Sequence, residues 1–575
     1  MKISSINILI GGLIAISSFS ALGQDSLLYI LQDELNREYE ALKKQDQVPY
    51  YMHLRVSDAV NYSVTASFGS LVTSSRQRQR ICTPQIRLGN YDRDNTRQIP
   101  GVFGYGDYSG DYAQNLPLDN NGKAIAQMIW QSNNELYKTV QKQYKQVINN
   151  DIKPDDKNLS PDFSRETPRV HYDSLMNPAT YDINLTQWED NLREISGLFK
   201  HDEDIIVGIA NLQVNVERRY FVSTEGSSII QNFYRCDLHI SASIKADGGK
   251  EVPIYLSYEA FQPKDLPDKD TLIEATIGLV KKLKLLQKAP LAEPYTGPAI
   301  FSPKVTGVFF HEIFGHRIEG HRLKSESDGQ TFKNKLNERV LPRYINVISD
   351  PILQQYADQD LFGHYKYDDQ GVKAEKVFVV EEGILKTFLM SRRPILNIEN
   401  SNGHGRAEPG QSIVSRQSNL IVQSSKQLDG DKMKKMLIKE CKRQNKPYGY
   451  YFKEVTGGFT TTDRYMPNAF NIMPTEVYRI YVDGRPDELV RGVDLIGTPL
   501  AMFSEIEATG NETGVFVGYC GAESGNVPVT TIAPSIFVNQ IETQRKPESE
   551  VTLPLLKSPE LEMMLNKTNR PLKND

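Results

Sequence analysis

Apolar and polar residues alternate in two different periods along the first half of the chain. Between Ser26 and Lys43 apolar residues recur every three or four positions, which is typical of an amphipathic helix. Residues 50–97 alternate with a period of two and are rich in β-branched side chains, so we expect strands there. The same patterns predict helices over 124–148, 185–200 and 271–288, and strands over 205–216, 220–223 and 229–244.

A short segment from Glu293 to Pro298, with two prolines and one glycine, separates this half from a strand-dominated remainder. There, residues 377–380 and 384–390 flank one expected hairpin turn, and residues 477–482 and 488–493 flank another. The order of elements predicts an α+β protein of two domains rather than a strict βαβ repeat. We expect a mixed α/β N-terminal domain over residues 24–295, with an inserted loop near 98–122. A β-rich, barrel-like or sandwich-like C-terminal domain follows over 296–545, and then a tail over 546–575.

The first 23 residues have the pattern of a secretory signal peptide. Lys2 precedes an apolar run, and Ala21-Leu22-Gly23 is a small-x-small cleavage site. We therefore expect an exported protein, periplasmic or extracellular after cleavage. No later window approaches 18 continuous apolar residues, so no integral membrane segment is expected in the mature chain. The net charge of −5 gives no indication of nucleic-acid binding.

The stretch from Thr306 to His321 places three histidines and two carboxylates within an apolar run. Polar side chains in a buried helix need a partner, and a metal ion is the usual one for this set. His311 and His316 are then imidazole ligands, and Glu312 is the general base for a metal-activated water. Five positions apart, the histidines lie about 140° apart on an ideal helix. The motif thus predicts a π-bulge or an unwound helix end, which Gly315 favours.

Cys520 is the candidate third ligand. It has a glycine beside it and precedes Pro528, which is expected to end any regular element and to leave the thiol on a turn. Two histidines and one cysteine leave a fourth position open, as in catalytic zinc sites, and this set favours zinc over a hard ion. The other cysteines, Cys82, Cys236 and Cys441, form no metal-binding pair, and one disulfide among them remains open.

A plainer interpretation also exists for each of these residues. The histidines can be ordinary core or surface residues of an amphipathic helix. His404, between two glycines, is expected on a flexible loop, where it is either a substrate-binding candidate or a surface histidine. The roles of Glu319 and His321 stay open at this point.

The motif His311-Glu312-x-x-x-His316, followed by Glu319, resembles that of the TldD side of the TldD/TldE (PmbA) family of metalloproteases. Further blocks occur in the order typical of that family. They are Tyr367–Val372, Val379–Leu385, Ser401–Arg406, Val490–Gly497, and Cys520-Gly521 leading to Val527-Pro528-Val529. The resemblance is specific from about Ala299 to Val538.

This resemblance implies a two-domain TldD/PmbA-like architecture whose C-terminal domain carries the metal helix. It implies one Zn²⁺ per active chain, held by His311, His316 and Cys520, with Glu312 as the catalytic base. It also implies an enclosed active site that takes unfolded or flexible peptides, in a homodimer or a heterodimer with a TldE/PmbA-like subunit. TldE-type members lack the metal motif, so this chain is similar to the active subunit.

Two functions are therefore expected. The first is a zinc-dependent metallopeptidase. The alternative is a non-catalytic, zinc-containing peptide-binding or assembly subunit, in which His321 or Glu319 completes a closed metal site.

Overall fold

The computed structural model describes residues 25–99, 107–150, 160–246, 251–324, 328, 330–463 and 470–546. The expected signal peptide (1–23) and the expected tail, except residue 546, lie outside these ranges, as do residues 100–106 of the expected loop. Across the described ranges, no helix has both the length and the apolar character needed to cross a membrane.

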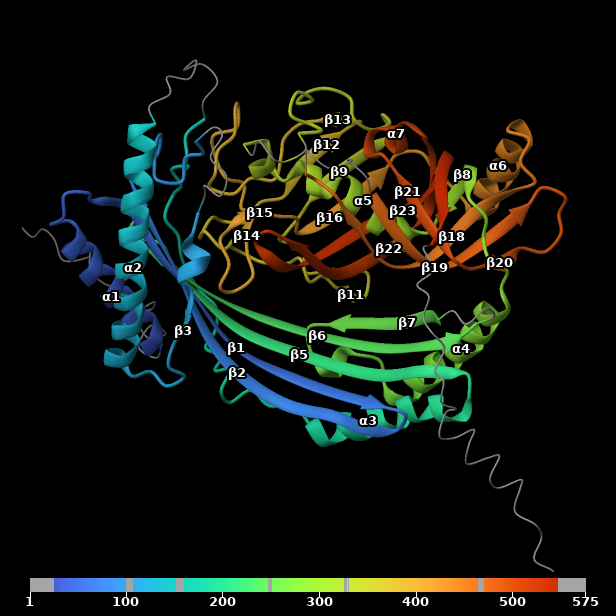
Figure 1. The fold of residues 1–575 in the computed structure, drawn as a ribbon, viewed down its shortest axis with the longest axis horizontal. Coiled ribbons are helices and arrows are strands. Elements are labelled where there is room, and N and C mark those ends of the chain that lie inside the picture. Colours follow the sequence, from blue (N-terminus) through green and yellow to red (C-terminus); the bar gives the residue numbers. More distant parts are fainter. Residues whose placement is uncertain are drawn as a thin grey trace, which may run out of the picture.

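The first half of the chain forms a seven-stranded, largely antiparallel sheet with helices packed against it (Figure 1). Its strand order is β3-β2-β1-β5-β6-β4, with β7 paired to β6. The elements are α1 (Ser26–Leu42), β1 (Pro49–Ser67), β2 (Ser70–Leu88), β3 (Gln114–Asn115), α2 (Gly122–Asn149), β4 (Val170–Tyr172), α3 (Leu185–Gly197), β5 (Ile205–Ser223), β6 (Ser228–Lys245), β7 (Glu251–Ala260) and α4 (Lys269–Lys288).

Two long hairpins, β1/β2 and β5/β6, make up most of this sheet. The helices α1 and α2 pack at one end of the hairpins, whereas α3 and α4 pack on one face near the other end (Figure 1). The helices and the principal strands predicted from the two periodicities are thus confirmed, with bounds that differ by a few residues. The inserted loop contains the two-residue strand β3, which pairs with β2.

The other face of this sheet carries buried charges that meet the second half of the chain. Arg219 forms an ion pair with Asp369, and Arg55 lies 3.6 Å from the same carboxylate. Glu217 pairs with Arg219 at 2.9 Å and with Arg235 at 3.7 Å. Burial alone would raise the pKa of Glu217, but the two arginines outweigh burial and lower that pKa from 4.5 to about 2.

We expect Glu217→Gln to alter acid stability. Because the folded-state pKa of Glu217 lies below its unfolded value, its contribution is present above about pH 4.5 and is lost as the pH falls toward about 2. The shift corresponds to about 3 kcal/mol in the free energy of unfolding. Chemical denaturation across this window should show a shallower pH dependence for the variant than for the wild type. Glu40→Gln, at an exposed helix position, is the control, and parallel curves for Glu217→Gln and wild type would contradict the assignment.

The second half forms a twelve-stranded sheet, a two-stranded ladder beside it and another at the β14/β15 loop. The elements up to α6 are β8 (Tyr295–Phe301), α5 (Pro303–Ile313), β9 (Ile345–Ser349), β10 (Gln355–Tyr356), β11 (Gln359–Asp360), β12 (Val377–Glu381), β13 (Ile384–Leu385), β14 (Gly405–Arg406), β15 (Val414–Ser415), β16 (Asn419–Ser424), β17 (Gln427–Leu428) and α6 (Gly430–Arg443). The remaining elements are β18 (Tyr448–Thr460), β19 (Phe470–Tyr481), β20 (Glu488–Val490), β21 (Val493–Gly497), α7 (Pro499–Ser504), β22 (Ile506–Ala522) and β23 (Gly525–Arg545).

Five of these strands close into a ring. The pairings run β23-β21-β19-β18-β8, and β8 pairs back to β23. The apolar side chains of α5 share one core cluster with residues of these strands. The predicted β-rich, barrel-like second part is confirmed, although the expected strand 384–390 ends at Leu385. Because β8 begins at Tyr295, the second sheet starts near the expected boundary, and the division into two domains stays a prediction.

Candidate metal centre

The helix α5 brings the first candidate ligand to the centre of the second half. The Ser302 hydroxyl caps its N-terminus by accepting from the Val305 amide at 3.3 Å, and Pro303 is its first residue. The α-helix ends at Ile313, and a 3₁₀ turn over Gly315–Ile318 follows. The two histidines therefore lie on different kinds of turn. The unwound end predicted from their five-residue spacing is confirmed, and the π-bulge is not the form it takes.

Gly315 is needed for space. A Cβ at this position would lie 1.8 Å from Oε1 of Gln417, so the buried Gln417 side chain would have to move. The Gln417 amide in turn donates to the carbonyl oxygen of His311 at 3.3 Å. Sequence reasoning identified Gly315 through backbone freedom, whereas its structural basis is this close approach.

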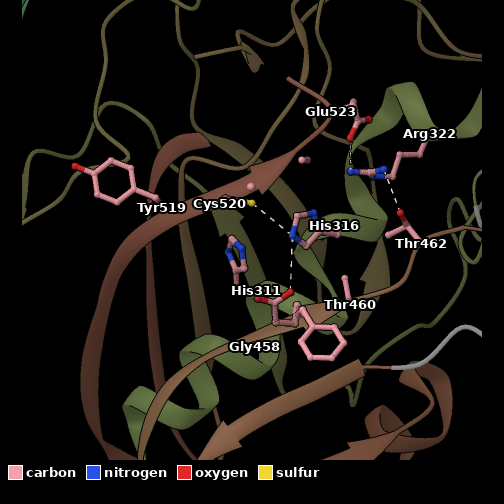
Figure 2. A pocket seen from close by; sticks show the side chains of 13 residues that line it. His311, His316, Arg322, Gly458, Thr460, Thr462, Tyr519, Cys520 and Glu523 are labelled. Carbon is pink, nitrogen blue, oxygen red and sulfur yellow. Dashed lines mark hydrogen bonds and ion pairs between the residues drawn. The ribbon is translucent and has the colours of Figure 1, made fainter. Parts of the chain in front are cut away.

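Three candidate donors converge at the end of α5. Ligand atoms of His311, His316 and Cys520 all lie within 4.8 Å of one another, and the three side chains are buried (Figure 2). Sγ of Cys520 lies 3.4 Å from Nε2 of His316. This is close to the roughly 3.5 Å expected between sulfur and nitrogen ligands of a tetrahedral zinc ion with bonds of about 2.3 and 2.0 Å.

Cys520 reaches the histidines from a strand and not from a turn. It lies on β22 opposite Val527 of β23, two residues before β22 ends. The expectation that Pro528 ends a regular element is wrong, because Pro528 lies inside β23 and pairs with Tyr519. β16 joins the other edge of β23 only from Thr530 onward, so a residue without an N–H group is tolerated at position 528.

The local electrostatics favour a thiolate. Burial raises the pKa of the Cys520 thiol, but the neighbouring imidazoles of His316 and His311 outweigh it and hold that pKa well below its usual value. Within the described part of the chain, Nδ1 of His311 is buried and has no hydrogen-bond partner. A buried unpaired nitrogen beside a stabilised thiolate fits a bound cation.

Glu319 and His321, whose roles the sequence left open, do not belong to the group of three donors. Oε2 of Glu319 lies 3.3 Å from Nδ1 of His316 and 2.8 Å from Arg322. Burial alone would raise the pKa of Glu319, yet Arg322 and His316 lower it to about 2. A carboxylate on Nδ1 orients the ring so that Nε2 faces Cys520. His321 instead pairs with Glu523.

A cavity of about 260 Å³ opens beside the donors. Its lining comprises the three donors and Glu312, Arg322, Gly458, Phe459, Thr460, Thr462, Tyr519, Gly521, Ala522 and Glu523. Oε2 of Glu312 lies 3.8 Å from Nε2 of His316. A Cβ at Gly458 would lie 2.8 Å from Cγ of Glu312, so this glycine makes room for the carboxylate. The site thus combines three candidate metal donors with a carboxylate on the wall of a cavity.

His404 does not contribute to this cavity. It is 0% exposed, and its ring lies 2.9 Å from Oγ of Ser349 and 3.0 Å from the carbonyl oxygen of Asn402. Burial lowers its pKa to about 3. The expected placement of His404 on a flexible loop or at the surface is wrong, because its neighbours enclose the ring, and a role in substrate binding stays a prediction. All four cysteines are free and lie in separate clusters, so no disulfide links Cys82, Cys236 and Cys441.

Sequence reasoning missed two buried residues next to the donors, Arg416 and Gln417. They belong to a run of five polar residues, 415–419, that is 0% exposed. The available signal was the position of this polar run directly before the apolar positions of β16.

The sequence matches a known family and several known proteins. Residues 294–545 match the family described as the PmbA/TldA metallopeptidase C-terminal domain. A metalloprotease of Methanocaldococcus jannaschii is 27% identical over 420 residues, which cover 72% of this chain and 86% of that protein. A zinc metalloprotease TldD homolog of Saccharolobus solfataricus is 25% identical over 264 residues, which cover 45% of this chain and 53% of that protein.

The fold also matches a solved structure. The crystal structure of TldE from Thermococcus kodakarensis superposes with a TM-score of 0.58 over 90% of this chain and 100% of that one, at 15% sequence identity. At this identity the likeness shows the fold alone.

Proposed function

Since the chain belongs to the TldD/TldE (PmbA) family, we propose that it is a zinc-dependent metallopeptidase that hydrolyses peptide bonds in unfolded or flexible peptides. The observation that carries the proposal is the convergence of His311, His316 and Cys520 within 4.8 Å, with Glu312 on the wall of the same cavity. Relatives named as metalloproteases support the assignment at the level of the family.

The donor set fits zinc, and each residue has a distinct task. A zinc ion held by His311, His316 and Cys520 would polarise the scissile carbonyl and activate water. Glu312 would take the proton from that water and deliver it to the leaving amine. Glu319 holds the His316 ring through Nδ1, so that Nε2 is free to bind the metal.

Burial of the site supports a flexible substrate. His316 and Glu312 are each 7% exposed, and Cys520 is 2% exposed. The backbone of a folded domain is held within its own structure and cannot enter between such buried residues, whereas an extended segment can.

Metal analysis together with a peptide assay tests this function. The purified mature protein should contain about one zinc per chain and cleave an unstructured reporter peptide. A chelator should abolish cleavage, and added zinc should restore it. Zinc-loaded protein that cleaves no peptide in a diverse unstructured library would favour the alternative, a non-catalytic zinc-containing subunit. Against that alternative, Glu319 and His321 are engaged by Arg322 and Glu523, so they do not close the metal site.

We expect Gly458→Ala to lower kcat while leaving zinc content unchanged. The new methyl group would lie 2.8 Å from Cγ of Glu312 and 3.1 Å from the carbonyl oxygen of Asn471, so the carboxylate must move. A displacement of about 1 Å in a catalytic group costs about 100-fold in rate. Gly457→Ala is unsuitable as a control because Gly457 has a φ of +158°. Thr456→Ala, at an exposed position of β18, is the better one. Wild-type kcat in Gly458→Ala would show that Glu312 does not need this space.

The partner and the location are further parts of the proposal. We propose a dimer, either of two copies of this chain or with a TldE/PmbA-like subunit, because the resemblance of the sequence to the family implies one. The N-terminal 23 residues support export to the periplasm or the medium. Two mass measurements on the exported protein test these points. The mass of the chain should be lower by that of residues 1–23 if cleavage follows Gly23, and the mass of the native homodimer should be twice that of the mature chain.

A further inference from the structure

Arg416 and Gln417, which lie in the loop between β15 and β16, contact both sides of the candidate metal centre. The Gln417 amide donates to the carbonyl oxygen of His311 at 3.3 Å. Arg416 extends toward the β22/β23 hairpin, where Nη1 donates to Oγ of Ser524 at 2.7 Å and to the carbonyl oxygen of Gly525 at 2.9 Å. Nη2 donates to the carbonyl oxygen of Cys520 itself. The side chain of Arg416 is therefore bonded to the backbone of the third donor.

The same arginine also faces the carboxylate behind the second donor. Nε of Arg416 lies 3.5 Å from Oε1 of Glu319, and both side chains are 0% exposed. Oε2 of Glu319 contacts Nδ1 of His316. A continuous series of polar contacts thus runs from the His316 ring through Glu319 and Arg416 to Cys520. In the sequence, Cys520 comes 204 residues after His316.

Neither charge would be stable in this position alone. A buried guanidinium requires a counter-charge and acceptors for its N–H groups. Here Glu319 supplies the counter-charge, and the β22/β23 hairpin supplies acceptors for Nη1 and Nη2. Arg416 links the segment after α5, through Glu319, to the carbonyl oxygen of Cys520 on β22. Glu523 joins the same two regions through its ion pairs with His321 and Arg322, but Arg416 is bonded to the backbone of the candidate ligand itself.

We propose that Arg416 is a positioning residue that holds Cys520 within bonding distance of the metal that His316 and His311 share. The inference rests on the zinc-binding part of the proposed function. It assigns to Arg416 a share of the zinc affinity, although this residue does not touch the ion. Residues outside the ligand set that orient ligands typically change metal affinity by about 10- to 100-fold.

Arg416→Met tests this role, because methionine keeps the length and removes the charge and donors. We expect its zinc affinity, measured by competition with a chromophoric chelator, to fall by about 10- to 100-fold. In the cobalt(II)-substituted protein, the thiolate-to-cobalt charge-transfer absorption should weaken or shift, because the thiol is no longer held at the ion. Arg416→Lys keeps the charge beside Glu319 but cannot reach all three hairpin acceptors. The zinc affinity of this variant should therefore lie between those of the wild type and Arg416→Met.

The matched control is Arg392→Met. Arg392 is equally buried at 2% exposure, and it pairs with Glu225 at 2.6 Å and donates to the carbonyl oxygen of Ser164. Its loss should lower the stability of the metal-free protein to a comparable degree while leaving zinc affinity and the cobalt spectrum unchanged. Arg416→Met with wild-type zinc affinity and an unaltered cobalt spectrum would overturn the proposal and leave Arg416 a structural role only.

A second variant keeps the test decisive if Arg416→Met does not fold. Ser524→Ala removes only the acceptor at 2.7 Å and should weaken zinc binding by about 3- to 10-fold. An unchanged affinity in this variant contradicts the proposal. The readouts separate the two hypotheses, because zinc-loaded wild-type protein without peptidase activity contradicts only the proposed function, and equal affinities across the variants contradict only the role of Arg416.

Discussion

Glu312→Gln should retain about one zinc per chain and lose about 10²- to 10⁴-fold in kcat, the usual contribution of general acid–base catalysis. Glutamine keeps the size and the hydrogen-bonding capacity of the side chain but cannot accept a proton. Glu312 is also outside the group of three donors, so its charge is not needed to hold the metal. Zinc content by elemental analysis and turnover of an unstructured peptide are the two measurements.

Glu454→Gln is the appropriate control for this variant. Glu454 lies on β18, is partly exposed, and forms an ion pair with Lys304 at 3.4 Å. Its replacement should change neither zinc content nor turnover. If Glu312→Gln cleaves peptide at the wild-type rate, Glu312 is not the base, and the proton must pass to another group lining the cavity.

Cys520→Ser is expected to lose zinc. A serine hydroxyl is not ionised at neutral pH, and it lacks the soft sulfur that zinc prefers. The drop in zinc affinity should exceed the loss of about 10- to 100-fold that is typical when a residue that only orients a ligand is replaced. The charge-transfer absorption of the cobalt-substituted protein should disappear, because it requires a thiolate ligand.

Another buried cysteine separates this effect from a general loss of packing. Cys441 lies on α6 in a small apolar cluster and is 0% exposed, so Cys441→Ser should lower stability without altering zinc affinity. Wild-type zinc binding by Cys520→Ser would exclude the thiol as a ligand. It would also remove the main argument for a shared ion at the end of α5.

The helix end between the two histidines was predictable from the sequence because helical geometry is fixed. At about 100° per residue, His311 and His316 cannot face one ion from a regular helix, and the structure unwinds after Ile313. Their proximity to Cys520 was also expected, although ligation and catalysis stay predictions.

Other features depended on neighbours that a single sequence does not reveal. Pro528 lies within β23 because β16 begins to pair only at Thr530. His404 is buried because Ser349 and Ser418, from other segments, enclose its ring. Similarly, Arg416 can be buried only where Glu319 and the β22/β23 hairpin meet it. Partners of this kind are set by tertiary structure and carry no local periodicity.

The buried ion pairs of Asp369 have a consequence for dissecting the protein. Residues 294–545 contain all three candidate ligands, but Arg55 and Arg219, which neutralise Asp369, come from the first sheet. A fragment limited to 294–545 would leave Asp369 without either arginine and would expose its surrounding loops. Where the carboxylate stays buried, the loss of such a pair costs about 3–5 kcal/mol. The half that holds the candidate ligands is therefore not a portable module, and engineering it will require the long hairpins beneath it.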